Sequence, residues 1–249
     1  MLEIESLSKS FGGIVVADNI DLVMRPGRIL GLIGPNGAGK TSLFNLVSGL
    51  YAADAGTIRL DGKSLDGLAL HERARRGLAR TWQHVRLFPS LSVIDNLIIG
   101  ARHYPAESLV ALMFAPGKIH FAGKAARATA RDILARIGLP DAADTSVGDL
   151  PYGQQKLVGV ARALMNDARC LLLDEPMAGV EGQAYEAMQK IVRQVAAAGV
   201  AVCVVEHNVA FIRDLCDEAV FMFQGRILAR GSIADLIANP ELTELYFGH

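Results

Sequence analysis

The chain alternates between short apolar runs and segments with helical periodicity. Residues 29–33 and 170–173 are apolar throughout, a pattern typical of strands buried on both faces of a parallel sheet. Residues 2–7 and 20–24 alternate roughly between apolar and polar positions, which predicts half-buried strands. Strands that alternate with helices in this way predict an α/β fold with a largely parallel sheet and right-handed crossovers.

Turn chemistry indicates two hairpins and several helix ends. The predicted strand at 57–60 ends at an Asp-Gly pair, and a Gln-Gly pair separates predicted strands at 218–223 and 226–229. Ser92 can cap a helix, and Gly138 followed by a proline predicts the end of another. The expected helices cover residues 42–47, 93–97, 124–137 and 181–198, with one more after Gly153.

Two segments allow more than one interpretation. Residues 109–114 are strongly apolar, which fits either packing inside a helical region or contact with a membrane partner. A basic helix carries His71, Arg73, Arg75 and Arg76. These arginines could meet phosphate, but a solvated helix face is the preferred interpretation.

A glycine-rich loop lies between an apolar run and a helical segment, and it carries a lysine followed by a hydroxyl. This arrangement is typical of a phosphate-binding loop. Glycines let backbone N–H groups approach phosphate oxygens, and the helix N-terminus adds positive charge. We expect Lys40 to reach the β- and γ-phosphates and Thr41 to hold Mg²⁺. The candidate nucleotide-binding residues are Gly34, Pro35, Asn36, Gly37, Ala38, Gly39, Lys40, Thr41 and Ser42.

An acidic pair closes the apolar run at 170–173. A carboxylate at the C-terminal end of a parallel strand lies at the ligand-binding edge of such a sheet. We expect Asp174 to hold Mg²⁺, directly or through water, and Glu175 to orient and deprotonate the water that attacks the γ-phosphate. Alone, such a pair would more often cap a helix, but the upstream phosphate loop favours catalysis.

Composition narrows the class of protein. The 249 residues, 51% of them hydrophobic, allow one domain with a subdomain. A net charge of −1 argues against a basic nucleic-acid-binding surface. Cys170, Cys203 and Cys216 lack metal-ligand spacing, which predicts reduced core residues in a cytosolic protein. We find no signal peptide and no apolar run of membrane-spanning length, so a membrane role would require a partner.

In motif order and over its whole length, the chain resembles the ATP-binding subunit of ABC transporters. Residues 34–41 match the Walker A loop of that family, and residues 170–175 match Walker B with its catalytic glutamate. The resemblance implies a P-loop NTPase fold of ABC type. Such a fold has a largely parallel core sheet, an antiparallel β subdomain and a helical signature subdomain.

The same resemblance implies a single ABC ATPase domain over residues 1–249. Residues 1–83 and 168–249 would form the RecA-like core with the β subdomain. Residues 84–167 would form the helical signature subdomain.

Three further residues match functional positions of the family. Gln83 matches the Q-loop glutamine, which senses Mg²⁺ and links to the transmembrane subunit, and His207 matches the switch histidine that contacts the γ-phosphate. Phe11 matches the aromatic that stacks on adenine, although exposed aromatics in turns often only cover the core. The implied catalytic residues are Lys40, Gln83, Glu175 and His207, and the implied metal-binding residues are Thr41, Gln83 and Asp174.

Two family motifs depart from their common form. Residues 150–154 read Leu-Pro-Tyr-Gly-Gln where Leu-Ser-Gly-Gly-Gln is usual, and Pro151 offers neither a hydroxyl nor an N–H. Gly153, Gln154 and the positive end of the following helix remain to contact ATP across a dimer. The D-loop, residues 178–181, reads Ala-Gly-Val-Glu where Ser-Ala-Leu-Asp is common.

The tyrosine-containing signature, together with residues 80–88 and 206–208, resembles the ATPases of branched-chain amino-acid importers. That resemblance implies ATP and Mg²⁺, transmembrane permease subunits, and a second ATPase subunit that is identical or paralogous. It also implies a periplasmic or extracellular substrate-binding protein acting indirectly, no nucleic acid, and a peripheral location on the cytoplasmic face of the inner membrane. The alternatives are an exporter ATPase for lipid or lipopolysaccharide and a soluble ABC ATPase outside transport.

Overall fold

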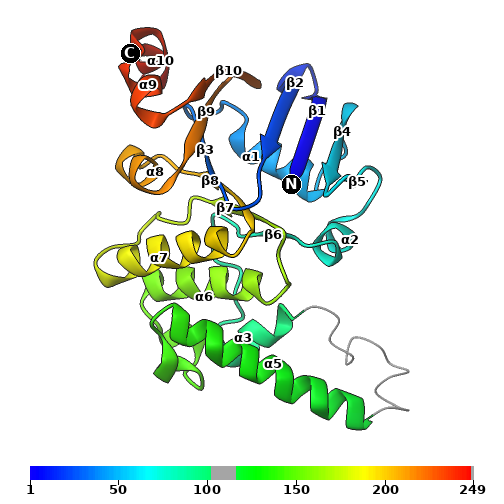
Figure 1. Cartoon of the computed structure of the whole chain (residues 1–249), viewed down its shortest axis with the longest axis vertical. Coiled ribbons are helices and arrows are strands. Elements are labelled where there is room, and N and C mark those ends of the chain that lie inside the picture. The colour runs from blue at the N-terminus through cyan, green and yellow to red at the C-terminus, as the bar shows by residue number, and fades with distance from the viewer. Residues whose placement is uncertain (102–115, 248–249) are drawn as a thin grey trace. The chain divides into compact units, whose positions relative to one another are not determined.

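The computed structural model describes residues 1–101 and 116–247 (Figure 1). The apolar segment 109–114 lies outside the described residues. The chain forms two compact units, which we describe separately. The first unit comprises Met1–Gln83, Arg169–Pro176 and Val192–His249, and the second comprises His84–Ala168 and Met177–Ile191. The assignment of a RecA-like core and a signature subdomain stays a prediction.

A six-stranded sheet forms the centre of the first unit, in the order β10-β9-β3-β8-β7-β6. Its strands are β3 (Ile29–Ile33), β6 (Leu78–Arg80), β7 (Cys170–Asp174), β8 (Ala201–Val205), β9 (Glu218–Phe223) and β10 (Arg226–Gly231). All pairs are parallel except β9 with β10. Every residue of β3, β7 and β8 is buried. This confirms the two strands expected from the continuous apolar runs at 29–33 and 170–173.

A second sheet of the first unit is antiparallel, in the order β2-β1-β4-β5. It contains β1 (Leu2–Phe11), β2 (Ile14–Met24), β4 (Ala55–Leu60) and β5 (Lys63–Ser64). β1 and β2 extend further than predicted, because their ladder continues until Gly12 and Gly13 turn the chain with positive φ. The expected hairpin after β4 is confirmed: Asp61 and Gly62 turn the chain with φ of 50° and 74°.

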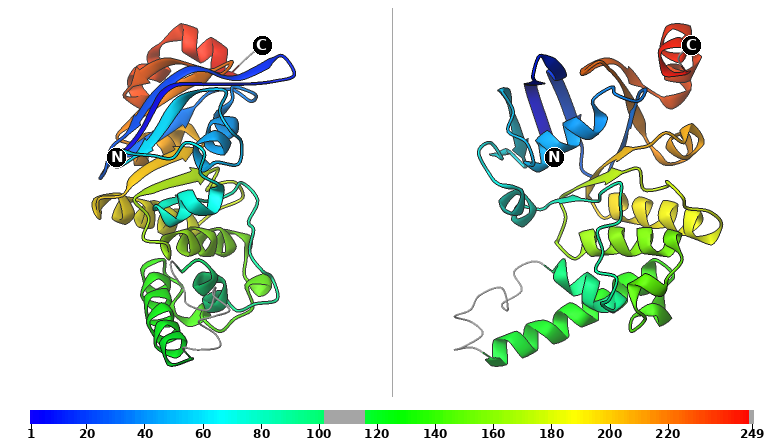
Figure 2. Two further views of the ribbon diagram at one scale, coloured as in Figure 1. Left: turned by 90° about the vertical axis from the view of Figure 1, so that its right-hand side faces the viewer. Right: turned by 180° about the vertical axis from the view of Figure 1, so that it is seen from behind.

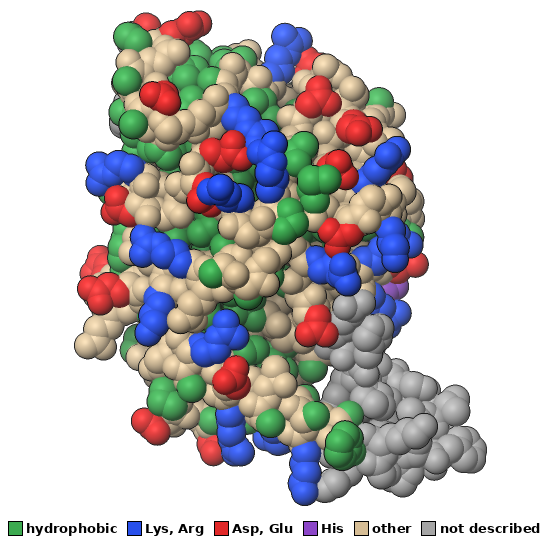
Figure 3. Space-filling view, in the orientation of Figure 1, with side chains coloured by type: hydrophobic (Ala, Val, Ile, Leu, Met, Phe, Trp, Pro, Cys, Tyr) green, Lys and Arg blue, Asp and Glu red, His purple; other side chains and the backbone are tan. Residues whose placement is uncertain are grey.

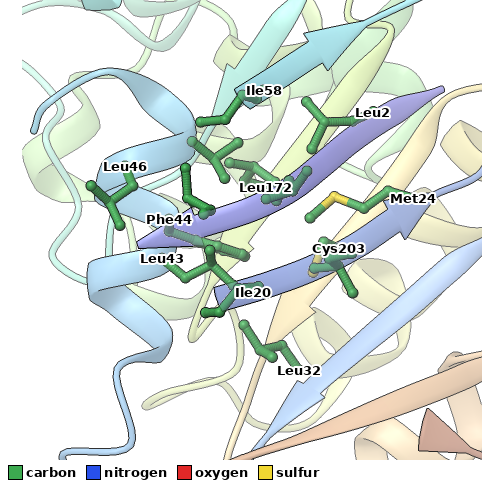
Figure 4. Close-up of a cluster of buried hydrophobic side chains, with 14 of the residues drawn as sticks. Leu2, Ile20, Met24, Leu32, Leu43, Phe44, Leu46, Ile58, Leu172 and Cys203 are labelled. Atoms are coloured by element: carbon green, nitrogen blue, oxygen red, sulfur yellow. The ribbon is translucent and has the colours of Figure 1, made fainter. Parts of the chain in front are cut away.

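The main apolar core of the first unit joins both sheets to helix α1 (Lys40–Ser48). In Figure 4, Phe44 of α1, Leu2 of β1 and Leu172 of β7 lie in one cluster. Figure 2 shows α1 beside the blue and cyan strands of the antiparallel sheet. Cys170 and Cys203 are buried free thiols, as expected, and burial raises the pKa of Cys170 to about 12. Cys216, also expected in the core, is a free thiol that is only partly buried.

Helix α2 (Leu70–Arg75) corrects one expectation. Its residue Arg73 is buried rather than solvated, and its Nη1 donates hydrogen bonds to the carbonyls of Leu46 and Val47 at 3.0 and 2.8 Å. These carbonyls lie in the last turn of α1, where a helix runs out of its own N–H donors, and the Leu46 carbonyl also accepts the Gly49 N–H at 3.1 Å. Desolvation lowers the pKa of Arg73. His71, Arg75 and Arg76 are exposed, as expected.

The remaining helices of the first unit are α8 (Val209–Leu215), α9 (Ile233–Ala238) and α10 (Pro240–Phe247). The second unit contains α3 (Val93–Ile99), α5 (Pro116–Arg136), α6 (Tyr152–Leu164), two short 3₁₀ turns and the start of α7 (Gln183–Ala197). The predicted Ser92 cap is confirmed, because its Oγ accepts the Asp95 N–H at 3.2 Å. The described part of α5 includes residues well before the start of the helix expected at 124–137. None of the described helices is long and apolar enough to cross a membrane.

Two glycines with positive φ test the packing of the antiparallel sheet. A Cβ on Gly56 (φ 88°) would lie 2.5 Å from the Ser6 carbonyl oxygen, whereas one on Gly62 (φ 74°) would meet no atom within 4 Å. Both alanine substitutions carry a left-handed backbone cost of about 1–2 kcal/mol, and only Gly56→Ala adds a backbone collision. We expect Gly56→Ala to lower the free energy of unfolding by about 3 kcal/mol, measured by urea denaturation. Equal losses in the two variants would contradict this account.

Candidate functional site

The glycine-rich loop connects β3 to α1, and its glycines meet two different demands. A Cβ on Gly34 would collide with the carbonyl oxygen of Met222, and one on Gly39 with that of Val16. Gly37 (φ 78°) has open space around it, so there the backbone conformation alone favours glycine. The close packing of neighbouring strands therefore requires two of the glycines, in addition to any approach of phosphate.

Lys40 is the first residue of α1 and is buried at 6% exposure. Its Nζ donates hydrogen bonds to the carbonyl oxygens of Gly34 and Pro35 at 2.7 and 2.8 Å. Desolvation lowers the pKa of Lys40, while the carboxylates of Glu175 and Asp174 oppose that shift. The Lys40 ammonium group is thus hydrogen-bonded to carbonyls of the loop, and it interacts electrostatically with the carboxylates of Glu175 and Asp174.

The ends of three parallel strands bring three predicted catalytic residues together. Gln83 follows β6, Glu175 follows β7 and His207 follows β8. The Gln83 amide Nε2 donates to Glu175 Oε2 at 2.7 Å, and His207 Nε2 lies 3.1 Å from Glu175 Oε1. One carboxylate therefore contacts an amide and an imidazole from distant parts of the sequence.

Glu175 has an unusual backbone conformation. Its φ is 46°, in the left-handed region that non-glycine residues seldom occupy. Its N–H donates to the Val205 carbonyl at 2.9 Å, which continues the pairing of β7 with β8. Such conformations cluster at functional sites, where the surrounding structure holds them in place.

Asp174 ends β7 and is buried at 2% exposure. Its Oδ2 accepts a hydrogen bond from Arg80 Nη2 at 2.9 Å, and its N–H donates to Thr81 Oγ1 at 3.3 Å. Arg80 ends β6, so adjacent strands supply both members of this buried ion pair. Thr41 lies one residue after Lys40 in the first turn of α1 and is exposed.

The structure adds residues to which the sequence analysis assigned no role. Glu206 is buried at 4% exposure, and its Oε2 accepts the His207 N–H at 3.1 Å. The Tyr246 hydroxyl donates to the His207 carbonyl at 3.1 Å. Burial and the nearby Glu206 raise the pKa of Tyr246. An acidic residue directly after an apolar strand is a signal for Glu206, whereas nothing near Tyr246 in the sequence indicates its contact.

Phe11 ends β1 with 42% of its surface exposed. Its ring meets the edge of Tyr51, with centroids 5.2 Å apart and planes at 72°. The ammonium of Lys9 lies 5.0 Å from the Phe11 ring centroid. An accessible aromatic ring suits stacking on a base, and its role toward adenine stays a prediction.

The predicted signature residues Gly153 and Gln154 belong to the second unit, in the first turn of α6. The Pro151 carbonyl accepts the Gln154 N–H at 2.9 Å, so proline serves as the cap despite lacking a hydroxyl. A Cβ on Gly179 would lie 3.1 Å from the ring of Tyr152. The signature segment and the D-loop are therefore packed against each other at their two unusual residues.

On the face shown in Figure 3, basic and acidic side chains of the described residues lie interspersed. This pattern agrees with a formal net charge of −1 for the chain.

A glycine-rich loop before a helix, a buried lysine against it and a carboxylate at the ends of parallel strands define a P-loop nucleotide-binding protein. Comparison with known proteins gives the family. The ABC transporter family model matches residues 17–178. The chain is 32% identical to the high-affinity branched-chain amino acid transport ATP-binding protein BraF of Pseudomonas aeruginosa, over 100% of this chain and 98% of BraF. The corresponding LivG protein of Escherichia coli K12 is also 32% identical over the same shares.

Solved structures agree with this result. A nucleotide-free ATP-binding cassette from an ABC transporter superposes with a TM-score of 0.85 at 28% identity, over 100% of this chain and 99% of that one. A cassette in its ADP conformation gives the same TM-score and coverage at 29% identity. The chain belongs to the ABC transporter family, as an ATP-binding cassette ATPase, and its fold class is as predicted.

Replacement of the loop lysine tests nucleotide binding. We expect Lys40→Ala to weaken ATP binding about 10- to 100-fold, because a charge-assisted hydrogen bond contributes about 1.5–3 kcal/mol. Equilibrium titration with a fluorescent ATP analogue measures the change. Lys63→Ala, at an exposed residue of β5, is the matched control and should bind like the wild type. Wild-type affinity in Lys40→Ala would exclude the phosphate role.

Proposed function

We propose that this chain binds and hydrolyses ATP to power an ABC importer of branched-chain or related amino acids. The meeting of Gln83 and His207 on the Glu175 carboxylate is the observation that carries the hydrolytic part. The names of BraF and LivG, each 32% identical over the full chain, support the cargo. Because the similarity to both relatives extends over the full chain, it favours the role of a transport ATP-binding subunit for this protein.

The proposed mechanism uses the groups of the first unit. Phosphate oxygens replace the Gly34 and Pro35 carbonyls as acceptors for Lys40, and backbone N–H groups of the loop bind the same anion. Glu175 accepts a proton from the attacking water, while Gln83 and His207 orient its carboxylate. Catalysis then rests on positioning and on charge placed in advance.

The residues present fit Mg²⁺. Asp174, Thr41 and Gln83 offer a carboxylate, a hydroxyl and an amide, and Mg²⁺ prefers such oxygen ligands together with substrate phosphates. Among residues 1–101 and 116–247, no three His, Cys, Asp or Glu side chains gather into a metal site. A donor set with one carboxylate suits an ion that arrives with the nucleotide. The bound ion would neutralise charge on the phosphate oxygens.

A second ATPase subunit, identical or paralogous, would complete each site. Gly153 and Gln154, at the positive end of α6, would face the nucleotide held by the partner's loop. ATP would close the pair and hydrolysis would let it reopen, which is ligand-biased switching between two states.

The proposed partners in the membrane are permease subunits, with a periplasmic or extracellular substrate-binding protein acting indirectly. The second unit exposes large apolar side chains that suit a protein contact: Phe88 is 49%, Leu91 37% and Ile99 52% exposed. Such contacts would place the chain at the cytoplasmic face of the inner membrane.

An exporter ATPase is the second candidate. The lipopolysaccharide export system ATP-binding protein LptB of Acidithiobacillus ferridurans is 30% identical over 100% of this chain and 97% of its own length.

Replacing the proposed base tests hydrolysis. We expect Glu175→Gln to retain ATP binding and lower kcat by at least about 100-fold, because the amide cannot accept the proton. Steady-state phosphate release and ATP titration measure the two effects. Glu186→Gln, at an exposed residue of α7, is the control and should keep full activity. Unchanged turnover in Glu175→Gln would rule out this base.

Affinity purification tests the transport assignment. We expect a tagged Glu175→Gln chain, purified in mild detergent with ATP, to retain two multi-span membrane proteins and a second ATPase, because slow hydrolysis preserves the closed state. Mass spectrometry identifies them, and transport assays on the purified complex separate import from export. Recovery of a soluble complex without membrane proteins would reject the transport proposal.

A further inference from the structure

Arg80 connects helix α1, which follows the glycine-rich loop, to Asp174 at the end of β7. Its guanidinium is buried at 5% side-chain exposure, and Nη2 donates to Asp174 Oδ2 at 2.9 Å. Its Nη1 donates to Asn45 Oδ1 at 2.8 Å and to Ser48 Oγ at 2.9 Å. Asn45 and Ser48 belong to α1, so a single planar group bridges that helix and the end of β7.

Aromatic rings help to hold the guanidinium in place. The Arg80 Cζ lies 4.2 Å from the centroid of the Trp82 ring and 5.6 Å from that of Phe44. The backbone of Arg80 is paired in parallel with Leu172 of β7. Both ends of the residue are therefore constrained by the strand that carries Asp174.

A buried ion pair is weak evidence for stability, because desolvation offsets much of the attraction. The rigid fork of arginine does, however, fix the orientation of a carboxylate better than a flexible ammonium. Replacing a residue that hydrogen-bonds to a metal ligand typically lowers the metal affinity of the site by about 10- to 100-fold.

We infer that Arg80 is a positioning residue, which holds the Asp174 carboxylate and helix α1 in register so that Asp174 is presented to the Mg²⁺ of bound Mg–ATP. This inference rests on the proposed function, because it requires a nucleotide that arrives with Mg²⁺. It assigns Arg80 a role through Asp174 and not a contact with the reacting atoms.

The chain offers a matched control. Arg73 is also buried and also bonded to α1, through the Leu46 and Val47 carbonyls. Its Nη1 reaches the same C-terminal part of α1 as Arg80 does, but it donates to backbone carbonyls there rather than to side chains. Arg73→Met therefore removes a buried guanidinium that contacts α1, while Arg80, the partner of Asp174, stays in place.

The test measures how Mg²⁺ changes nucleotide binding, with no turnover. Calorimetry with a non-hydrolysable ATP analogue, first in EDTA and then at rising MgCl₂, gives the Mg²⁺ concentration for half of the affinity gain. We expect Arg80→Met to raise that concentration about 10- to 100-fold and to leave the affinity in EDTA unchanged. Arg80→Lys should give an intermediate rise, because it keeps the charge but cannot span three acceptors. Arg73→Met should keep the wild-type value while lowering the melting temperature.

The outcomes separate the inference from the function on which it rests. A wild-type protein whose binding does not respond to Mg²⁺ would overturn the proposed Mg²⁺ site itself. A responsive wild type with an unshifted Arg80→Met, or with equal shifts in Arg80→Met and Arg73→Met, would overturn the positioning role alone. If Arg80→Met does not fold, Arg80→Lys decides, since a wild-type Mg²⁺ response in that variant overturns the role and a raised requirement supports it.

Discussion

Parallel hydrogen bonding among β6, β7 and β8 is the constraint on which the site depends. Parallel strands end at the same edge of a sheet, so Gln83, Glu175 and His207 meet there although long crossovers separate them in the sequence. Register matters as much as direction, because side chains alternate between faces. Asp174 pairs with Val205 and lies buried. A slip of β7 by one residue would turn Asp174 to the opposite face of the sheet and break the contacts of Glu175 with Gln83 and His207.

The same edge concentrates charge inside an apolar core, which physical chemistry permits only with partners. Lys40 lies against loop carbonyls, Asp174 against Arg80, and Glu206 against the His207 N–H. Most of the stability must come from the buried apolar cluster around α1 and both sheets. The polar contacts fix the orientation of the charged side chains. Glu175 keeps an unfavourable left-handed backbone conformation at this edge, as residues at functional sites often do.

The sequence predicts those features of the fold whose causes are local. The apolar runs, the Asp-Gly turn and the Ser92 cap appear where the pattern places them, because each depends on a few adjacent residues. Burial of single arginines does not follow from such patterns. Arg73 and Arg80 lie in similarly basic stretches, and their partners come from α1 and β7, which only the tertiary fold brings near. For the same reason, the sequence places Gln83 and His207 after their strands but cannot show that both contact Glu175.

The departures in the signature segment and the D-loop are best understood as one packing change. Tyr152 stands where the family commonly has glycine, and its ring occupies space that a Cβ on Gly179 would approach to 3.1 Å. Gly179 stands where alanine is common, and its φ of 72° suits glycine alone. The bulky Tyr152 in the signature segment is thus accommodated by the absence of a side chain at Gly179 in the D-loop. Because the helix start at α6 and its Pro151 cap are intact, the positive end proposed to face a partner's nucleotide is preserved by this exchange.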